Sequence, residues 1–219
     1  MKYNCVIFDC DGTLIDTLED IAAAINQTLT IYGFPAVPFE KYRDMVGWGI
    51  FRLVTLALPE DARTEKNIKT LGARATQLME EQTSYRSRPY PGIPELLAEL
   101  KAKKFAIGVI SNKPDAALRR MINNLFSPAV FDAVCGLCPG MTPKPDPSAV
   151  WELLSEMNCL PASSVFVGDS EIDIETALNS GCYPLGVSWG FRSRSTLEAA
   201  GAARIIDTPQ EIWGILGKK

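Results

Sequence analysis

Short apolar runs that end in polar residues recur along this chain. The run Val6–Phe8 is uninterrupted, rich in β-branched and aromatic residues, and ends at Asp9. Such a run is typical of a strand that is buried on both faces of a parallel sheet. Further runs of the same kind occupy residues 105–110, 131–134, 164–168, 184–187 and 204–206. The pattern therefore predicts a parallel sheet whose strands are separated along the chain by other elements.

Helical spacing of apolar residues fills the intervals between most of these runs. Leu96, Leu97 and Leu100 share one face of a helix predicted over 94–103. Helices are also predicted over 114–125, 147–157, 195–200 and 209–216. Asp146 is expected to be the N-cap and Pro147 the first helical residue of its helix. This alternation predicts a doubly wound α/β fold, with a crevice at the carboxyl edge of the sheet.

The stretch between the first and the second apolar run has a purely helical pattern. A first helix is predicted from Asp16, which with Glu19 resembles a capping box, up to Tyr32. Further helices are expected over 37–46, over 50–57 and, after Pro59, up to Tyr85. Residues 86–92 are rich in helix breakers and return the chain to the α/β part. We therefore predict an α/β core of residues 1–16 and 88–219, with residues 17–87 inserted as an all-helical domain.

Two carboxylates follow directly after the first predicted strand. Residues two apart in extended chain point the same way, so Asp9 and Asp11 are expected to project together into the crevice, while Cys10 packs on the opposite side. Gly12 allows a sharp exit from the strand, and Thr13 adds a hydroxyl near the same point. The alternative interpretation is an ordinary acidic turn.

Other strands and loops bring polar groups to the same edge. The run 105–110 ends in Ser111 and Asn112, where a hydroxyl and amides at a helix start suit a phosphate group. Lys144 lies among three prolines, which stiffen the backbone that presents its ammonium group. Asp169 and Asp173 follow the run 164–168. A fixed lysine in this position would neutralise the charge of a carboxylate and of a bound phosphate.

The composition narrows the chemistry of this chain. It has 219 residues, 47% of them apolar, a net charge of −4 and no histidine. The absence of histidine excludes Ser-His triads and most catalytic zinc sites, so carboxylates, lysines and hydroxyls remain. No dense basic cluster indicates a nucleic-acid partner, and no run is long enough for a signal peptide or a membrane span. We therefore predict a cytoplasmic protein that binds neither nucleic acid nor membrane.

Six cysteines are scattered along the chain, and we expect free thiols. Cys135 and Cys138 have the spacing of a redox or metal pair. Without a second pair or a histidine, packing in the core or in a loop is the preferred interpretation.

Taken together, these motifs resemble those of the haloacid dehalogenase superfamily. The segment Asp9–Asp16 resembles its first motif, Asp-x-Asp-Gly-Thr-Leu-x-Asp, and Ser111 lies where the second motif has a serine or threonine. Lys144–Pro147 resembles the third motif, Lys-Pro-x-Pro, and Gly168–Asp173 resembles the fourth. The resemblance covers essentially the whole chain, and it implies a core with the first strand central and a helical cap over the active site.

The resemblance also implies roles for the residues that match. In this family the first aspartate, here Asp9, attacks phosphorus and the second, here Asp11, acts as general acid and base. The phosphate-binding residues implied are Thr13, Ser111, Asn112 and Lys144, of which Lys144 also supports catalysis. A hard divalent ion, Mg²⁺, would be held by the Asp9 carboxylate, the Asp11 backbone carbonyl and Asp169. Ser170 and Asp173 would lie behind these ligands, because their Ser-x-x-Asp spacing is that of a helix cap.

One stretch of the cap resembles the caps of phosphoglycolate phosphatases. It is the segment 46–54, which contains Gly47, Trp48 and Gly49. An ordinary turn between helices is the other interpretation. Arg43 and Arg52 are candidates for binding a substrate carboxylate, since guanidinium pairs bidentately with it, although solvated arginines are more common.

The predicted function is that of a magnesium-dependent phosphomonoesterase acting on a small phosphorylated metabolite, with phosphoglycolate as the first candidate. A pyrophosphatase, a nucleotidase or a β-phosphoglucomutase-like enzyme of the same superfamily is the alternative, although the mutase's cap-hinge histidine is absent here. A phosphate-binding regulatory protein without turnover is a further alternative. We expect a monomer or a homodimer.

Overall fold

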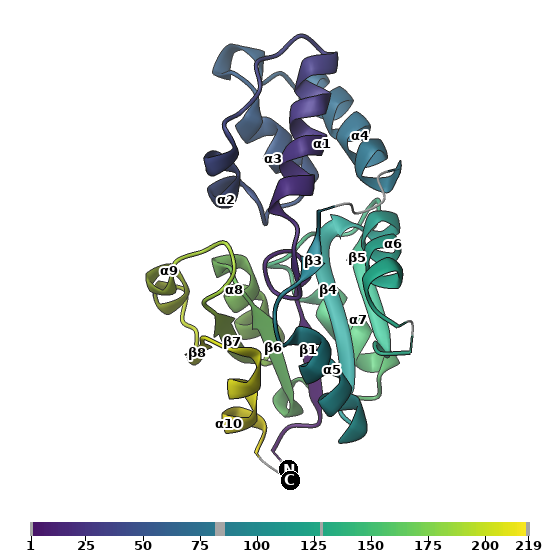
Figure 1. Cartoon of the computed structure of the whole chain (residues 1–219), viewed down its shortest axis with the longest axis vertical. Coiled ribbons are helices and arrows are strands. Elements are labelled where there is room, and N and C mark those ends of the chain that lie inside the picture. The colour runs from purple at the N-terminus through teal and green to yellow at the C-terminus, as the bar shows by residue number, and fades with distance from the viewer. Residues whose placement is uncertain (1, 82–85, 128, 218–219) are drawn as a thin grey trace.

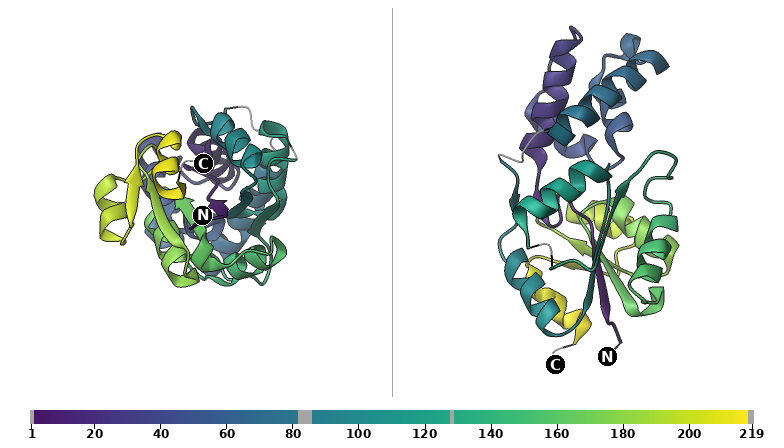
Figure 2. Two further views of the ribbon diagram at one scale, coloured as in Figure 1. Left: turned by 90° about the horizontal axis from the view of Figure 1, so that it is seen from below. Right: turned by 90° about the vertical axis from the view of Figure 1, so that its right-hand side faces the viewer.

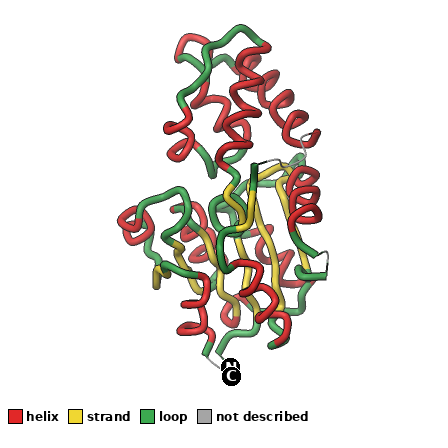
Figure 3. The backbone as a smooth tube through the Cα atoms, in the orientation of Figure 1, coloured by secondary structure: helices red, strands yellow, loops and turns green. Residues whose placement is uncertain are grey.

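The computed structural model describes residues 2–81, 86–127 and 129–217 of the chain. Two units are visible in Figure 1, an α/β core and a smaller helical unit at one end of it. Figure 3 shows that the strands gather in the core, whereas the unit at the end is built of helices and loops. The predicted fold class, an α/β core with a helical insert, is therefore confirmed.

The core is built on one parallel sheet. Within the described residues its strand order is β5-β4-β1-β6-β7-β8, and each pair of neighbours is parallel. The strands are β1 (Cys5–Phe8), β4 (Ala106–Pro114), β5 (Ala133–Leu137), β6 (Ser164–Gly168), β7 (Tyr183–Val187) and β8 (Arg204–Ile206). Phe8, the last residue of β1, lies opposite Val109 of β4 and Val167 of β6. Strands β1 and β6 therefore end close together at one edge, whereas β4 continues to Pro114.

Helices cover both faces of the sheet, as the right-hand view of Figure 2 shows. One face, with Val6 and Phe8, packs against α5 (Ile93–Ala102), α6 (Asp115–Leu125) and α10 (Trp213–Leu216). The other face, with Cys5 and Ile7, packs against α7 (Ser148–Glu156) and α8 (Glu171–Ser180). Helix α9 (Arg194–Ala199) follows β7. Cys10 is buried with the first set, so the prediction that it packs away from Asp9 is confirmed.

The helical unit has an apolar cluster of its own. Its helices are α1 (Leu18–Ile31), α2 (Tyr42–Met45), α3 (Ile50–Ala57) and α4 (Glu65–Glu81). Leu29, Tyr42, Val54 and Leu71 are among the buried residues of this cluster. The chain enters and leaves the unit through β2 (Ile15–Asp16) and β3 (Arg88–Pro89), which pair in antiparallel fashion. The helix end predicted near Tyr85 lies outside the described residues.

Several predicted boundaries were wrong by a few residues. Asp16 belongs to β2, and Thr17 is the N-cap of α1 without a side-chain cap, because pairing with β3 keeps Asp16 extended. Pro147 is the N-cap of α7, and Asp146 instead accepts the Ser148 amide at 2.9 Å. In place of the helix predicted over 37–46, the structure has a 3-10 turn over 39–41 followed by α2.

The largest boundary error concerns the second predicted strand. Ser111 and Asn112 do not lie in a turn before a helix, because β4 runs on to Pro114. Pairing with β5 extends the strand, and Pro114 lies opposite Leu137 after a shift of register. Helix α6 then starts at Asp115. Among the helices of the described ranges, none is long and apolar enough to cross a membrane.

Candidate active site

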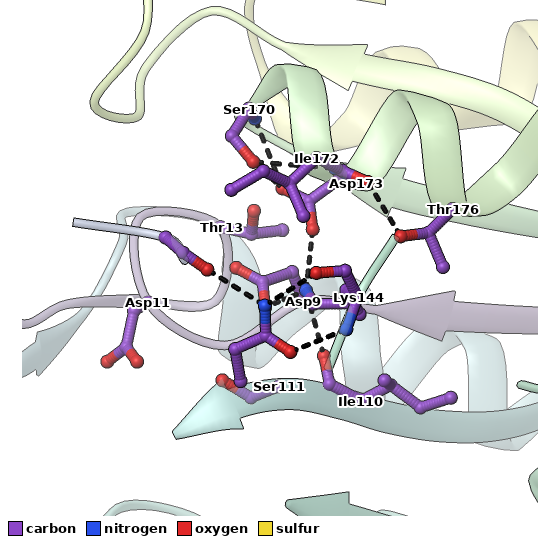
Figure 4. A network of polar contacts seen from close by, with 12 residues as sticks. Asp9, Asp11, Thr13, Ile110, Ser111, Lys144, Ser170, Ile172, Asp173 and Thr176 are labelled. Atoms are coloured by element: carbon purple, nitrogen blue, oxygen red, sulfur yellow. Dashed lines mark hydrogen bonds and ion pairs between the residues drawn. The ribbon is translucent and has the colours of Figure 1, made fainter. Parts of the chain in front are cut away.

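Asp9 lines a cavity between the core and the helical unit. It directly follows β1, its amide donates to Val167 O at 2.9 Å, and only 6% of the residue is exposed. The Lys144 ammonium donates to Asp9 Oδ1 at 2.7 Å and to Asp173 Oδ1 at 2.6 Å, and Figure 4 shows this network. The structure thus brings together three residues that are far apart in the sequence.

Asn112 fixes the backbone of Lys144. Its Oδ1 accepts the Lys144 amide at 2.8 Å, and its Nδ2 donates to Lys144 O at 3.1 Å and to Gly47 O at 3.0 Å. The two hydrogens of the Asn112 amide are thereby engaged by backbone carbonyls. Burial lowers the pKa of Lys144, but Asp173 and Asp9 raise it by more, so the net pKa lies above its usual value. The ammonium therefore stays charged and held in place.

Asp169 is oriented from two sides. It follows β6, is 1% exposed, and accepts the Thr13 hydroxyl at 3.1 Å and the Phe191 amide at 2.7 Å. Asp173 accepts the amide and the hydroxyl of Ser170 through Oδ2, which completes the predicted capping box at the start of α8. Thr13 itself is fully buried behind Asp169.

The carboxylates of this site lie close enough to share a cation. One oxygen each of Asp9, Asp169 and Asp173 lies within 4.8 Å of the others, and all three residues are buried. Burial raises the pKa of Asp9 well above its ordinary range, against the lowering effect of Lys144. Burial, followed by the Asp173 carboxylate, raises the pKa of Asp169 to about 7. Because Lys144 alone does not balance these charges, the oxygen donors fit a hard divalent cation.

Asp11 lies apart from this cluster. Its carboxylate bonds the Lys113 ammonium at 2.9 and 3.2 Å and, in Figure 4, points away from Asp9 and Lys144. Lys113 is almost fully buried; burial lowers its pKa, but Asp11 more than compensates, so the pKa is raised. Asp9 and Asp11 both line the cavity, as predicted, but the Asp11 carboxylate bonds Lys113 whereas Asp9 bonds Lys144. Sequence reasoning missed this ion pair with Lys113.

The helical unit supplies the opposite wall of the cavity. From the helical unit, the lining consists of apolar side chains and two glycines, namely Ile21, Val46, Gly47, Gly49, Ile50, Leu53 and Met79. The core contributes Ser111, Asn112, Lys113, Lys144 and Arg192, together with the carboxylates of Asp9, Asp11, Asp169 and Asp173.

The predicted cap residues divide into two groups. Gly47 and Gly49 line the cavity, whereas Trp48, Arg43 and Arg52 are exposed and are not part of its lining. A substrate-binding role for these residues stays a prediction. Arg192, a core residue that bonds carbonyls of the helical unit, was missed because one arginine in a loop carries no motif. Cys135 and Cys138 take no part in the acidic cluster described above.

Comparison with known proteins gives a family match. A family model described as haloacid dehalogenase-like hydrolase matches residues 6–187. A phosphoglycolate phosphatase of Vibrio cholerae serotype O1 is 33% identical over 191 residues, which cover 85% of this chain and 84% of the relative. An N-acetylmuramic acid 6-phosphate phosphatase of Pseudomonas aeruginosa is 30% identical over 221 residues, covering 100% of this chain and 96% of the relative.

A solved structure is similar over the full length. It is the crystal structure of a candidate phosphoglycolate phosphatase from Lactobacillus delbrueckii subsp. bulgaricus, with a TM-score of 0.91 and 31% sequence identity. The match covers 100% of both chains, so core and helical unit are similar together.

Proposed function

This chain belongs to the haloacid dehalogenase-like hydrolases and is a phosphatase, and from that premise we propose that it hydrolyses a small phosphorylated metabolite through an aspartyl-phosphate on Asp9. One observation carries the proposal. Asp9 is a buried carboxylate that lines the cavity, bonded to the Lys144 ammonium and adjacent to Asp169. A carboxylate so placed is a nucleophile, and the ammonium offsets its repulsion from a phosphate group.

The proposed reaction has two steps. An Asp9 oxygen forms a bond to phosphorus while the bond to the leaving oxygen breaks, and Asp11 gives that oxygen a proton. Asp11 then takes a proton from a water molecule that attacks the aspartyl-phosphate and releases phosphate. Asp11 reaches these positions once its ion pair with Lys113 opens. Ser111 and Lys144 are proposed to hold the transferring group. Asn112 and Thr13, whose side chains already bond Lys144 and Asp169, are proposed to fix those two residues.

We propose Mg²⁺ as the metal, held by the Asp9 carboxylate, the Asp11 backbone carbonyl and Asp169. When bound, it supplies positive charge that offsets repulsion between Asp9 and the phosphate. Asp173 belongs to the acidic cluster, but its oxygens already accept from Lys144 and from Ser170. We therefore assign Asp173 and Ser170 the task of fixing Lys144 and the start of α8.

The first candidate substrate is 2-phosphoglycolate, as in the relative from Vibrio cholerae. N-acetylmuramic acid 6-phosphate is the second candidate, because the relative from Pseudomonas aeruginosa is named for it. Both are phosphate esters of a hydroxyl group in a molecule that also carries a carboxylate. Pyrophosphate, nucleotides and hexose phosphates stay as alternatives within the superfamily, and a non-catalytic phosphate-binding protein is the alternative outside it.

We also propose that residues 17–87 form the cap and that residues 1–16 and 88–219 form the core. The separate apolar cluster of the helical unit supports this division. A cytoplasmic location, a monomer or homodimer, and the absence of nucleic-acid or membrane partners stay predictions from the sequence.

Phosphate release tests the proposal. We would measure it from both candidate substrates, pyrophosphate, a nucleoside monophosphate and a hexose phosphate, each with Mg²⁺ and with excess chelator. Mg²⁺-dependent release that is fastest for 2-phosphoglycolate is the expected result. Release that is fastest from another compound would overturn only the proposed substrate. Release that persists with excess chelator would overturn the proposed dependence on Mg²⁺, and no release from any compound would overturn the proposed reaction.

A further inference from the structure

A stretch of four consecutive residues connects Asp169 with the cap. They are residues 189–192, which follow β7 and precede α9, and we call them the 189–192 segment. Within this segment, some groups contact the core and others contact the cap. A displacement of the cap is therefore expected to move the groups that contact Asp169.

On the core side, the segment is packed against the loop that follows Asp9. The Trp189 indole donates to Thr13 O at 3.0 Å, and the Phe191 amide donates to Asp169 Oδ2 at 2.7 Å. Between them, a Cβ on Gly190 would lie 2.2 Å from Asp169 Cβ and 2.4 Å from Gly12 O. Because this backbone lies directly against Asp169, the carboxylate and the segment have to move together.

On the cap side, the segment contributes two side chains. Phe191 is buried in the apolar cluster of the cap helices. The Arg192 guanidinium donates to the carbonyls that end α2, namely Val46 O at 2.7 Å, Asp44 O at 3.3 Å and Arg43 O. Its Nε donates to Glu171 Oε2 at 3.1 Å, and 9% of the side chain is exposed. The planar fork thus joins the cap to the first turn of α8.

We propose that Arg192 is a positioning residue that couples docking of the cap to the orientation of Asp169. With the cap docked, the guanidinium fixes the 189–192 segment, and the Phe191 amide then holds the Asp169 carboxylate toward Asp9. With the cap released, this amide loses its fixed position. Coupling of this kind is reciprocal, so a metal bound at Asp169 must also favour the docked cap. The inference rests on the proposed function, since it takes Asp169 to be a metal ligand.

A change of local charge and a loss of positioning predict opposite effects of removing Arg192 on the affinity for a cation. Arg192 carries a positive charge and directly follows Phe191, whose amide bonds Asp169. Removal of the charge alone would therefore tighten binding of a cation. If Arg192 instead acts by holding the segment, its removal weakens binding. The sign of the change separates a positioning role from a mere change in local charge.

The test uses the full chain and two readouts besides activity. Mg²⁺ binding is measured by calorimetry, and hydrogen exchange of residues 42–50 is followed with and without Mg²⁺. The variants are Arg192→Ala and Arg192→Lys. Arg194→Ala is the matched control, because Arg194 lies two residues further on, is 44% exposed and pairs with Asp207 of the core.

In the wild type, Mg²⁺ should slow exchange of residues 42–50 about fivefold. Arg192→Ala should bind Mg²⁺ about fivefold more weakly and lose the effect of Mg²⁺ on the cap. Arg192→Lys, which keeps the charge but not the fork, should fall between wild type and Arg192→Ala, and Arg194→Ala should match the wild type.

Unchanged or tighter Mg²⁺ binding by Arg192→Ala would overturn the inference, as would weaker binding with the cap response intact. Should Arg192→Ala fail to fold, Arg192→Lys decides by the same two criteria. Failure of the wild type to bind Mg²⁺ would overturn the metal-dependent function, and the inference with it. A wild type that binds Mg²⁺ while the variants behave otherwise than expected would overturn the inference alone.

Discussion

The two walls of the cavity are built on different principles. The core wall includes buried charges in direct contact, such as Lys144 with Asp9 and Asp173. The cap wall, over the described residues, presents apolar side chains and glycine backbone, with Ile50 and Leu53 as examples. Charged groups that face reacting atoms set the chemistry, whereas an apolar wall sets shape and excludes water. We infer that the core determines which reaction occurs and that the cap determines which leaving group fits.

The largest expected effect is on the core wall. Asp9→Asn keeps the size of the side chain but removes the nucleophile, so phosphate release should fall about 10⁴-fold or more. Binding of a phosphate ligand, measured by calorimetry, should persist. A variant that still releases phosphate at a rate near that of the wild type would contradict the role of Asp9. A wild-type protein that binds phosphate compounds but releases none would instead favour the regulatory alternative.

The next effect concerns stability. Lys144→Met leaves Asp9 and Asp173 buried without their cation, and loss of one partner of a buried pair costs about 3 to 5 kcal/mol in free energy of unfolding. The matched control is Lys101→Met, because Lys101 pairs with Asp132 at 2.6 Å but both side chains are at least one-third exposed. That change should cost under about 1 kcal/mol. Urea unfolding measures both, and equal losses would contradict the buried-pair argument.

Much of the core wall could be predicted from the sequence. The strand ends at Asp9 and Asp169, and the stiff segment around Lys144, carry local signals in apolar runs and prolines. Parallel strands then bring these points to one edge. The ion pair of Lys113 with Asp11 carries no such signal, because it depends on β4 continuing to Pro114 through its pairing with β5.

The general acid is tested by the leaving group. Asp11→Asn should lower kcat/KM for an alkyl phosphate about 10²- to 10³-fold, because the leaving group then departs as an alkoxide that no acid protonates. For p-nitrophenyl phosphate the loss should be under about tenfold, because nitrophenolate leaves without a proton. Lys113→Met breaks the same ion pair from the other side and controls for its loss. Equal losses of Asp11→Asn with both substrates would contradict a role as general acid.

The cap wall could be predicted only in outline. Helical spacing identified α1 and α3, but the residues that face Asp9 depend on how the cap docks. That docking relies on Asn112 bonding Gly47 O and on Arg192 bonding the end of α2. Hydrogen bonds from core side chains to cap carbonyls leave no trace in the cap sequence, because any residue supplies a carbonyl.

A methyl group on the cap loop tests the role of shape. Gly47 has a φ of +123°, and a Cβ there would lie 2.9 Å from Ile172 Cδ1. Gly47→Ala should therefore displace the loop and raise KM about tenfold, with kcat for p-nitrophenyl phosphate changed less. Gly33→Ala is the matched control, since Gly33 also has a positive φ but no heavy atom within 4 Å of its Cβ position. Similar KM values for the two variants would contradict a role of the loop in fit.

The smallest expected effect concerns the two exposed arginines of the cap. If Arg43 or Arg52 binds a substrate carboxylate, replacement by alanine raises KM for 2-phosphoglycolate but not for ethyl phosphate, which has no carboxylate. Both side chains lie outside the cavity lining, so we expect changes under about twofold for either substrate, as for solvated surface charges. Steady-state kinetics with the two substrates decides. A loss of about tenfold or more for 2-phosphoglycolate alone would assign charge recognition to the cap and end the contrast between the two walls.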